Sequence, residues 1–180
     1  VLGQMIEPLR FPERSVKPGS NENWAVAGTA ETRGNVVTSI FLDFDELEAL
    51  NIRLQERYAE IAAKEVRYET ILTDDANVIL VAYGCSSRIA HTAVEQLRSE
   101  GVRAGLLRPQ TLFPFPADAL RRLAAKEDVR FLVVEMSNGQ LRDDVLLATE
   151  CNRPVGLVSR MGGTLITAEE IIAEAERILA

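Results

Sequence analysis

The sequence has 180 residues, of which 47% are hydrophobic, and a formal net charge of −7. This length suits one domain, alone or with an extension, and the acidic balance disfavours nucleic acid and anionic membranes as partners. No apolar run approaches the roughly 20 residues of a membrane-spanning helix. Two cysteines and one histidine exclude a disulfide framework, a four-thiolate cluster and most zinc sites, so we expect no metal site and a reducing cytoplasm.

Residues 1–42 are predicted to be the end of a preceding domain followed by a linker. Pro8, Pro12 and Pro18, with the Gly-Ser-Asn run after them, break any regular periodicity. The apolar opening VLGQMIEPL has no initiator methionine and no charged leader, which indicates a cut through a longer protein rather than a signal peptide. Residues 36–42, VVTSIFL, fit either a short strand or a loop that packs a few apolar side chains.

Residues 43–76 are assigned to a connecting region dominated by one long helix, which we expect to run to about residue 70. Asp43 is placed to cap its first turn, with Glu46 three residues on. Apolar side chains follow at spacings of three and four and form a narrow stripe: Leu47, Leu50, Leu54, Tyr58 and Ile61. Such a stripe packs either on its own domain, which we favour, or on a neighbouring subunit.

Residues 77–180 alternate regularly between apolar strands and amphipathic helices. Strands are expected at 78–82, 104–107, 131–135 and 155–159, and helices at 87–99, 117–126, 141–150 and 168–179. Continuous apolar runs such as VILVA and FLVV are typical of strands buried on both faces. The sequence therefore predicts a three-layer α/β domain, with a mainly parallel sheet of about five strands and helices on both faces.

Four turns are expected to converge outside the carboxyl ends of the strands, where such sheets bind ligands. They contain the residues that we single out as an anion-binding or interface edge: Gly84, Ser86, Ser87, Arg108, Asn138, Gly139 and Arg160. The turn around Gly84 places backbone N–H groups and two hydroxyls at a helix N-terminus, which suits a phosphate or another anion. The competing and favoured interpretation is that Ser86 or Ser87 caps the helix.

Other residues near these turns also have two interpretations. We favour Cys85 as a small buried turn residue over a nucleophile, and His91 as a surface or partly buried side chain over a base. Arg108 and Arg160 fit anion ligands and ion pairs equally well. Glu135 is either an active carboxylate or a partner of the Ser-Asn-Gly turn that follows it.

The loop Phe113-Pro114-Phe115-Pro116 is a stiff apolar segment. It either covers the domain core or forms an exposed contact patch, and we favour the patch because two prolines fix the loop without partners.

Several blocks of the chain resemble the C-terminal region of the α subunit of 2-oxoacid:ferredoxin oxidoreductases. They are VILVAYGCSSRIA with the helix after it, then GLLRPQTLFPFP, then FLVVEMSNGQLRDDV. The 2-oxoisovalerate and 2-oxoglutarate types are the most similar, and the opening VLGQMIEPL resembles the end of the pyrimidine-binding domain. Two departures weaken the transfer of any ligand contact: Cys85 stands where the family often has a small or hydroxyl residue, and Ser137 precedes Asn138 in a turn that often starts with Asn.

The resemblance implies a transketolase C-terminal-like domain that mainly builds subunit contacts and has no catalytic residue of its own. It also implies that the whole enzyme converts a 2-oxoacid to an acyl-coenzyme A with thiamine diphosphate, magnesium and iron–sulfur clusters, and passes electrons to ferredoxin. This chain has two cysteines and no GDG…N-type motif, so we expect it to bind none of these cofactors. The expected partners are the other domains and subunits, ferredoxin indirectly, or a second copy in a homodimer.

Two alternatives stay open at this stage. One is an anion-binding or coenzyme A-binding module that uses the strand-end turns. The other is the same domain in a different thiamine enzyme, such as a transketolase or an oxoacid dehydrogenase β subunit.

Overall fold

The computed structural model describes residue 8, residue 11 and residues 24–36 and 38–180. The described chain forms two compact units, one from residue 8 to residue 59 and one from residue 60 to residue 180. The predicted linker residues Pro12 and Pro18, and nearly all of the VLGQMIEPL opening, lie outside the described residues. The domain limits at residues 42 and 76 therefore stay predictions.

The larger unit is built on one five-stranded sheet with the order β1-β3-β2-β4-β5. Its strands are β1 (Tyr68–Ile71), β2 (Val78–Val81), β3 (Ala104–Pro109), β4 (Arg130–Glu135) and β5 (Val155–Ser159). Strands β2 to β5 pair in parallel, whereas β1 pairs with β3 in antiparallel at the edge. The predicted mainly parallel sheet is confirmed, and four carboxyl ends meet at one edge.

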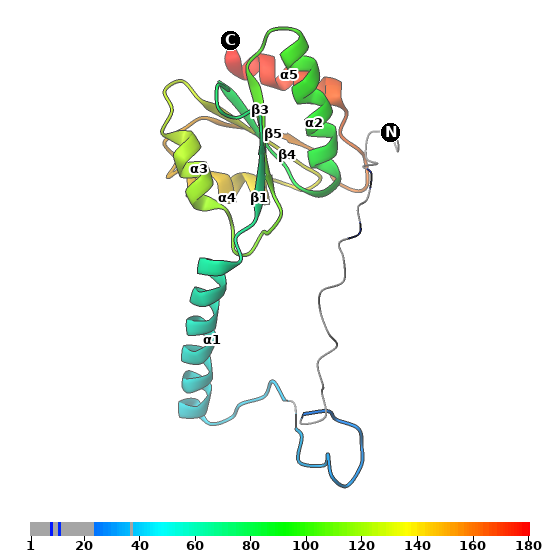
Figure 1. The fold of residues 1–180 in the computed structure, drawn as a ribbon, viewed down its shortest axis with the longest axis vertical. Helices are drawn as coiled ribbons and strands as arrows, with labels where there is room; N and C mark the ends of the chain where they lie inside the picture. The colour runs from blue at the N-terminus through cyan, green and yellow to red at the C-terminus, as the bar shows by residue number, and fades with distance from the viewer. Residues whose placement is uncertain (1–7, 9–10, 12–23, 37) are drawn as a thin grey trace. The chain divides into compact units, whose positions relative to one another are not determined.

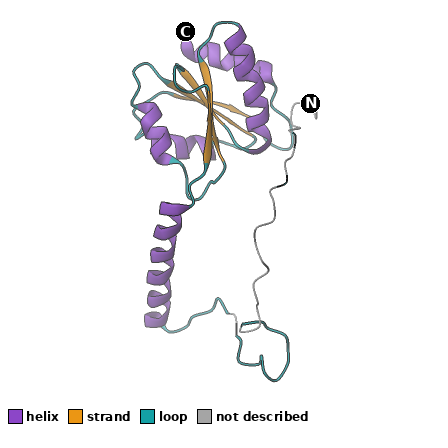
Figure 2. Ribbon diagram, viewed as in Figure 1, coloured by secondary structure: helices purple, strands orange, loops and turns teal. Residues whose placement is uncertain are grey.

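Helices cover both faces of this sheet, which gives the predicted three layers (Figures 1 and 2). Helices α2 (Gly84–Ser99) and α5 (Ala168–Leu179) share one hydrophobic cluster with side chains such as Leu80 and Leu132. Helices α3 (Ala117–Ala124) and α4 (Gln140–Ala148) share a second cluster with Ile79 and Phe131. Successive strand residues point to opposite faces, and helices cover both faces. The run VILV is therefore buried along its whole length.

Helix α1 (Phe44–Lys64) ends six residues before the predicted limit. Its N-terminus is capped as expected, since the N–H of Glu46 donates to Asp43 Oδ1 at 3.0 Å. The predicted continuation to residue 70 is wrong, because Tyr68–Ile71 form β1 instead. The hydrogen bonds that β1 gains along β3 come from a distant segment, so the local apolar spacing does not reveal them.

The structure also tests the predictions for residues 36–42 and for the start of α5. Of residues 36–42, those that the structure describes form no strand, which favours the loop interpretation. Helix α5 begins with the predicted capping box, in which Thr167 and Glu170 exchange hydrogen bonds between side chain and backbone.

Candidate functional site at the strand ends

The order of the sheet creates one position where a ligand is expected. After β2 the chain crosses to β3 on one side, and after β4 it crosses to β5 on the other side. The helices that follow these neighbouring strands, α2 and α4, therefore lie on opposite faces. In open α/β sheets, the crevice outside the carboxyl ends at such a switch point is the usual ligand site.

The turn after β2 leads directly into helix α2, which begins at Gly84 rather than three residues later. Gly84 has a φ of +57°, in the left-handed region that favours glycine. The helix receives no side-chain cap, and the Ser87 hydroxyl donates to the Gly84 carbonyl at 2.8 Å. The predicted capping by Ser86 or Ser87 is therefore wrong, because both serines already lie inside the first helical turn.

A pocket of about 220 Å³ opens between this turn and the end of β4. Its lining residues are Tyr83, Gly84, Cys85, Ser86, Glu135 and Met136. The Ser86 side chain is only 4% exposed, and no residue that the structure describes is hydrogen-bonded to its hydroxyl.

Glu135 is buried where β4 ends, with 2% of its surface exposed. One oxygen of its carboxylate accepts a hydrogen bond from the N–H of Gly139, and the other accepts from the N–H of Leu141 at 2.7 Å. Gly139, with a φ of 100°, is the N-cap residue of α4. The interpretation of Glu135 as a partner of the following turn is confirmed.

Asn138 lies on the outside of the same turn. Its N–H donates to Gln140 Oε1 at 2.9 Å, and the Ser137 hydroxyl is bonded to the same oxygen. The turn is thus closed by its own side chains, and Asn138 stays exposed.

Arg108, near the end of β3, and Arg160, directly after β5, each face an acid. Arg108 Nη1 lies 3.7 Å from Glu69 Oε2 on the neighbouring β1, and Arg160 forms an ion pair with Glu170 in the first turn of α5. The ion-pair interpretation is confirmed for both. Of the seven residues singled out in the sequence, the structure brings Gly84 and Ser86 to the pocket, and Arg108 and Arg160 are not among its lining residues.

Cys85 is exposed, which corrects the expectation of a buried turn residue. The residues that follow it, Ser86 and Ser87, turn into the domain, and this leaves the thiol at the pocket rim. His91 is half-buried as expected, and its Nε2 lies 3.9 Å from Glu95 Oε1. Sequence reasoning missed Tyr83 and Met136, whose only signal was their position directly after buried strands.

A second, larger hollow of about 650 Å³ is lined mainly by apolar side chains at the end of α1, β1 and the loop after β3. Phe113 in that loop is 65% exposed, whereas Pro114 and Pro116 are buried. Phe115 packs against the α3–α4 cluster. The loop therefore both covers the core and presents an apolar surface, so the two interpretations of it hold together.

Within the described part of the chain, no three histidine, cysteine, aspartate or glutamate side chains gather in a way that would hold a metal ion. The same residues include no helix that is both long enough and apolar enough to cross a bilayer.

The profile of the family described as pyruvate:ferredoxin oxidoreductase core domain II matches residues 76–171. The chain is also 56% identical over 178 residues to ketoisovalerate oxidoreductase subunit VorB of Methanothermobacter thermautotrophicus. That alignment covers 99% of this chain and 50% of the relative, so the chain spans half the length of the curated subunit that it matches.

Two solved structures share the fold at low sequence identity. A 2-oxoglutarate:ferredoxin oxidoreductase from Magnetococcus marinus matches with a TM-score of 0.65 and 17% identity, over 78% of this chain and 24% of that one. A split-gene transketolase matches with a TM-score of 0.54 and 21% identity, over 63% of this chain and 41% of the other. These matches confirm the expected transketolase C-terminal-like fold. Because the family profile spans more than half of the sequence, the chain belongs to the family of pyruvate:ferredoxin oxidoreductase core domain II.

Proposed function

We propose that the chain is the C-terminal domain of the α-type subunit of a 2-oxoacid:ferredoxin oxidoreductase, and that its main role is assembly. The observation that carries this proposal is the 56% identity to a ketoisovalerate oxidoreductase subunit along 99% of the chain. The whole enzyme would oxidatively decarboxylate 2-oxoisovalerate or a similar branched-chain 2-oxoacid to its acyl-coenzyme A and pass the electrons to ferredoxin.

The residues of this chain do not fit the cofactors of that reaction. Two cysteines cannot supply the ligands of an iron–sulfur cluster, and the described residues offer no cluster of acids for the magnesium of thiamine diphosphate. These groups would therefore be held by other domains or subunits of the complex, and the chain alone would be inactive.

Exposed apolar surface supports the assembly role. Helix α1 has no buried residue, although Phe44, Leu47, Ile52 and Tyr58 are all on it. Exposed apolar side chains that gather on one surface are typical of protein–protein contacts. The hollow beside Phe113 adds a second apolar surface on the α/β unit. The binding of an anion, such as part of coenzyme A, at the strand-end residues remains a prediction from the sequence.

Purification of the tagged protein from its own cells tests the proposal. We expect other oxidoreductase subunits to co-purify, and the complex to reduce a viologen dye with 2-oxoisovalerate and coenzyme A. The isolated 180-residue chain, given thiamine diphosphate, magnesium and the same substrates, serves as the control and should show no turnover.

Two results would contradict the proposal. One is turnover by the isolated chain, which would place the chemistry within it. The other is a tagged protein that purifies without any partner from cells that contain an active complex. A higher kcat/KM with 2-oxoglutarate or pyruvate than with 2-oxoisovalerate would overturn the substrate assignment alone.

A further inference from the structure

The pocket between β2 and β4 contains hydrogen-bonding groups that the protein itself leaves unused. The first N–H groups of a helix have no partner within it, and no acceptor among the described residues is bonded to those of Gly84, Cys85 and Ser86. Ser86, with 4% of its residue surface exposed, belongs to the lining of the same pocket. A buried polar group normally has a partner, so this combination indicates that a ligand supplies one.

The carboxylate of Glu135 decides the charge of that ligand. The N-terminus of α2 carries a partial positive charge that by itself favours an anion. Glu135 lines the same pocket, and both of its oxygens already accept backbone hydrogen bonds. A second full negative charge placed beside this carboxylate would meet repulsion.

We propose that this pocket binds the carbonyl group of an uncharged amide. The carbonyl oxygen accepts hydrogen bonds from the N-terminal N–H groups of α2 and from the Ser86 hydroxyl. The amide N–H of the ligand donates to Glu135, whose oxygens keep lone pairs available. This assignment does not depend on the proposed role in an oxidoreductase, because it rests on the geometry of the pocket alone.

The size and walls of the pocket agree with a small neutral group. Its volume of about 220 Å³ lies below the range of roughly 300–1,000 Å³ that is usual for drug-sized ligands. Tyr83 and Met136, which are 38% and 40% exposed, provide apolar contact beside the polar groups.

The two cysteines of the chain allow a direct test. Cys85 lines the pocket, whereas Cys151 is not part of its lining, and both thiols are exposed and free. We would measure the alkylation rate of each thiol by mass spectrometry while adding acetamide, acetate or inorganic phosphate up to the order of 100 mM, which reaches millimolar affinities. Acetamide and acetate have nearly the same shape and differ in charge.

We expect acetamide to slow the alkylation of Cys85 in a saturable way and to leave Cys151 unaffected. Acetate and phosphate should protect Cys85 less at the same concentration. Amide NMR shifts of Gly84, Cys85 and Ser86 should move with the same dissociation constant as the protection.

Two variants separate the contribution of the Ser86 hydroxyl to acetamide binding from a general effect on helix α2. Ser86→Ala should weaken acetamide binding about fivefold, the equivalent of one hydrogen bond. The matched control is Ser99→Ala at the other end of α2, where the hydroxyl is bonded to the Gln96 carbonyl. Circular dichroism and the alkylation rate of Cys151 would show that each variant is folded.

Three outcomes would overturn the proposal. Stronger protection by acetate or phosphate than by acetamide would make the pocket an anion site. Equal protection of Cys85 and Cys151 would show a general solvent effect. No protection and no shift by any of the three compounds would show that the pocket binds no such group.

Discussion

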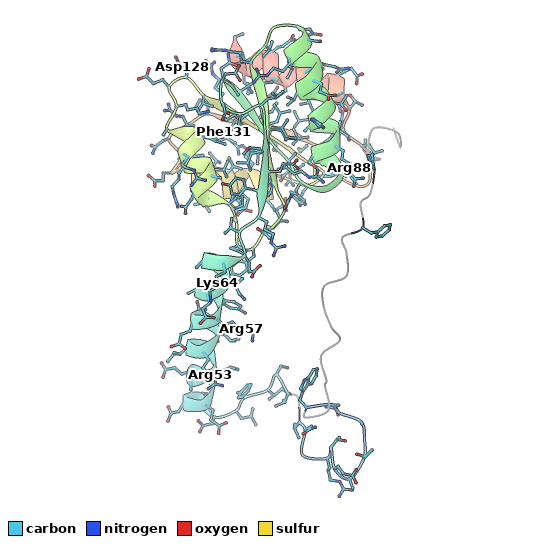
Figure 3. All side chains as sticks on the ribbon, in the orientation of Figure 1. Arg53, Arg57, Lys64, Arg88, Asp128 and Phe131 are labelled. Carbon is cyan, nitrogen blue, oxygen red and sulfur yellow. The ribbon has the colours of Figure 1, made fainter. Side chains whose placement is uncertain are left out.

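The α/β unit and helix α1 differ in how they obtain their stability. In the sheet, all four residues of β2 and five of the six residues of β3 are buried, and Phe131 on β4 is fully enclosed (Figure 3). Helix α1 has charged side chains such as Arg53, Arg57 and Lys64 along its length, and none of its residues is buried. The α/β unit is therefore stabilised by its own core, whereas α1 relies on local helix signals and would gain burial only from the proposed partner.

Core truncation should show the largest difference between these two regions. Phe131 is completely buried, so Phe131→Ala should destabilise the chain by about 3–5 kcal/mol, through lost burial and the cavity that remains. Leu47→Ala on α1 should change the free energy of unfolding by less than about 0.5 kcal/mol, because Leu47 is 38% exposed. Urea unfolding of the isolated chain measures both, and a similar loss for the two variants would contradict the comparison.

In the assembled complex, the substitution on α1 should have a clear effect, although it has little effect on the isolated chain. If α1 packs on other subunits, Leu47→Ala will weaken the complex while the isolated chain stays as stable as before. Gel filtration of the tagged complex measures this, and an unchanged complex would argue that the stripe on α1 is not a contact surface.

Removal of one buried charge should have the next largest effect. Glu135→Gln keeps the size of the side chain but loses a charge-assisted acceptor for the N–H groups of Gly139 and Leu141. We expect a loss of about 1–3 kcal/mol in unfolding free energy. Glu48→Gln on α1 is the matched control, because Glu48 is exposed; a change of similar size there would contradict the structural role of Glu135.

Capping provides the same chemistry in both regions. Thr167 caps α5 within the folded core, so Thr167→Ala should cost about 1 kcal/mol of global stability. Asp43 caps α1 in the same way, but Asp43→Ala should reduce only the helix content of α1, seen by circular dichroism or amide exchange. A global loss from Asp43→Ala would show that α1 folds together with the core.

The sequence predicts the sheet, its helices and the position of the pocket better than it predicts the chemistry there. Apolar runs such as Val78–Val81 and residues 131–134 reveal strands, because a strand that is covered on both faces buries mainly apolar side chains. The edge strand β1 was missed, because Tyr68–Ile71 are paired with a segment far along the chain and have no local strand signal strong enough to end the preceding helix.

The pocket shows a similar limit. Its two walls come from turns after β2 and β4, and only the strand order brings them together. The start of α2 depends on the left-handed conformation of Gly84, which moves Ser86 from a capping position to a buried one. Local patterns therefore identified Gly84 and Ser86 but assigned a different role to the hydroxyl.

The smallest expected effect concerns pH and an ion pair at the opposite end of the strands. Arg98 on α2 donates to both oxygens of Asp75 at 2.7 and 2.8 Å, to the Ala104 carbonyl at 2.6 Å and to the Leu72 carbonyl at 2.7 Å. The hydrogen bond from Arg98 holds the pKa of Asp75 below its ordinary value. Because the pair is partly exposed, solvent and salt screen it and keep its contribution small.

A lowered pKa in the folded state fixes the sign of the pH dependence. The contribution of Asp75 to stability is fully present above the ordinary pKa of an aspartate in the unfolded chain and is lost as the pH falls through the lower pKa of the folded state. Asp75→Asn should therefore flatten the acid side of the stability curve and leave its slope near pH 7 unchanged. Urea midpoints from pH 3 to pH 7, with Asp74→Asn as the neighbouring control, would measure this. An equal flattening by both variants would show that the contact with Arg98 is not its source, since Asp75 is the acid that pairs with that guanidinium among the residues that the structure describes.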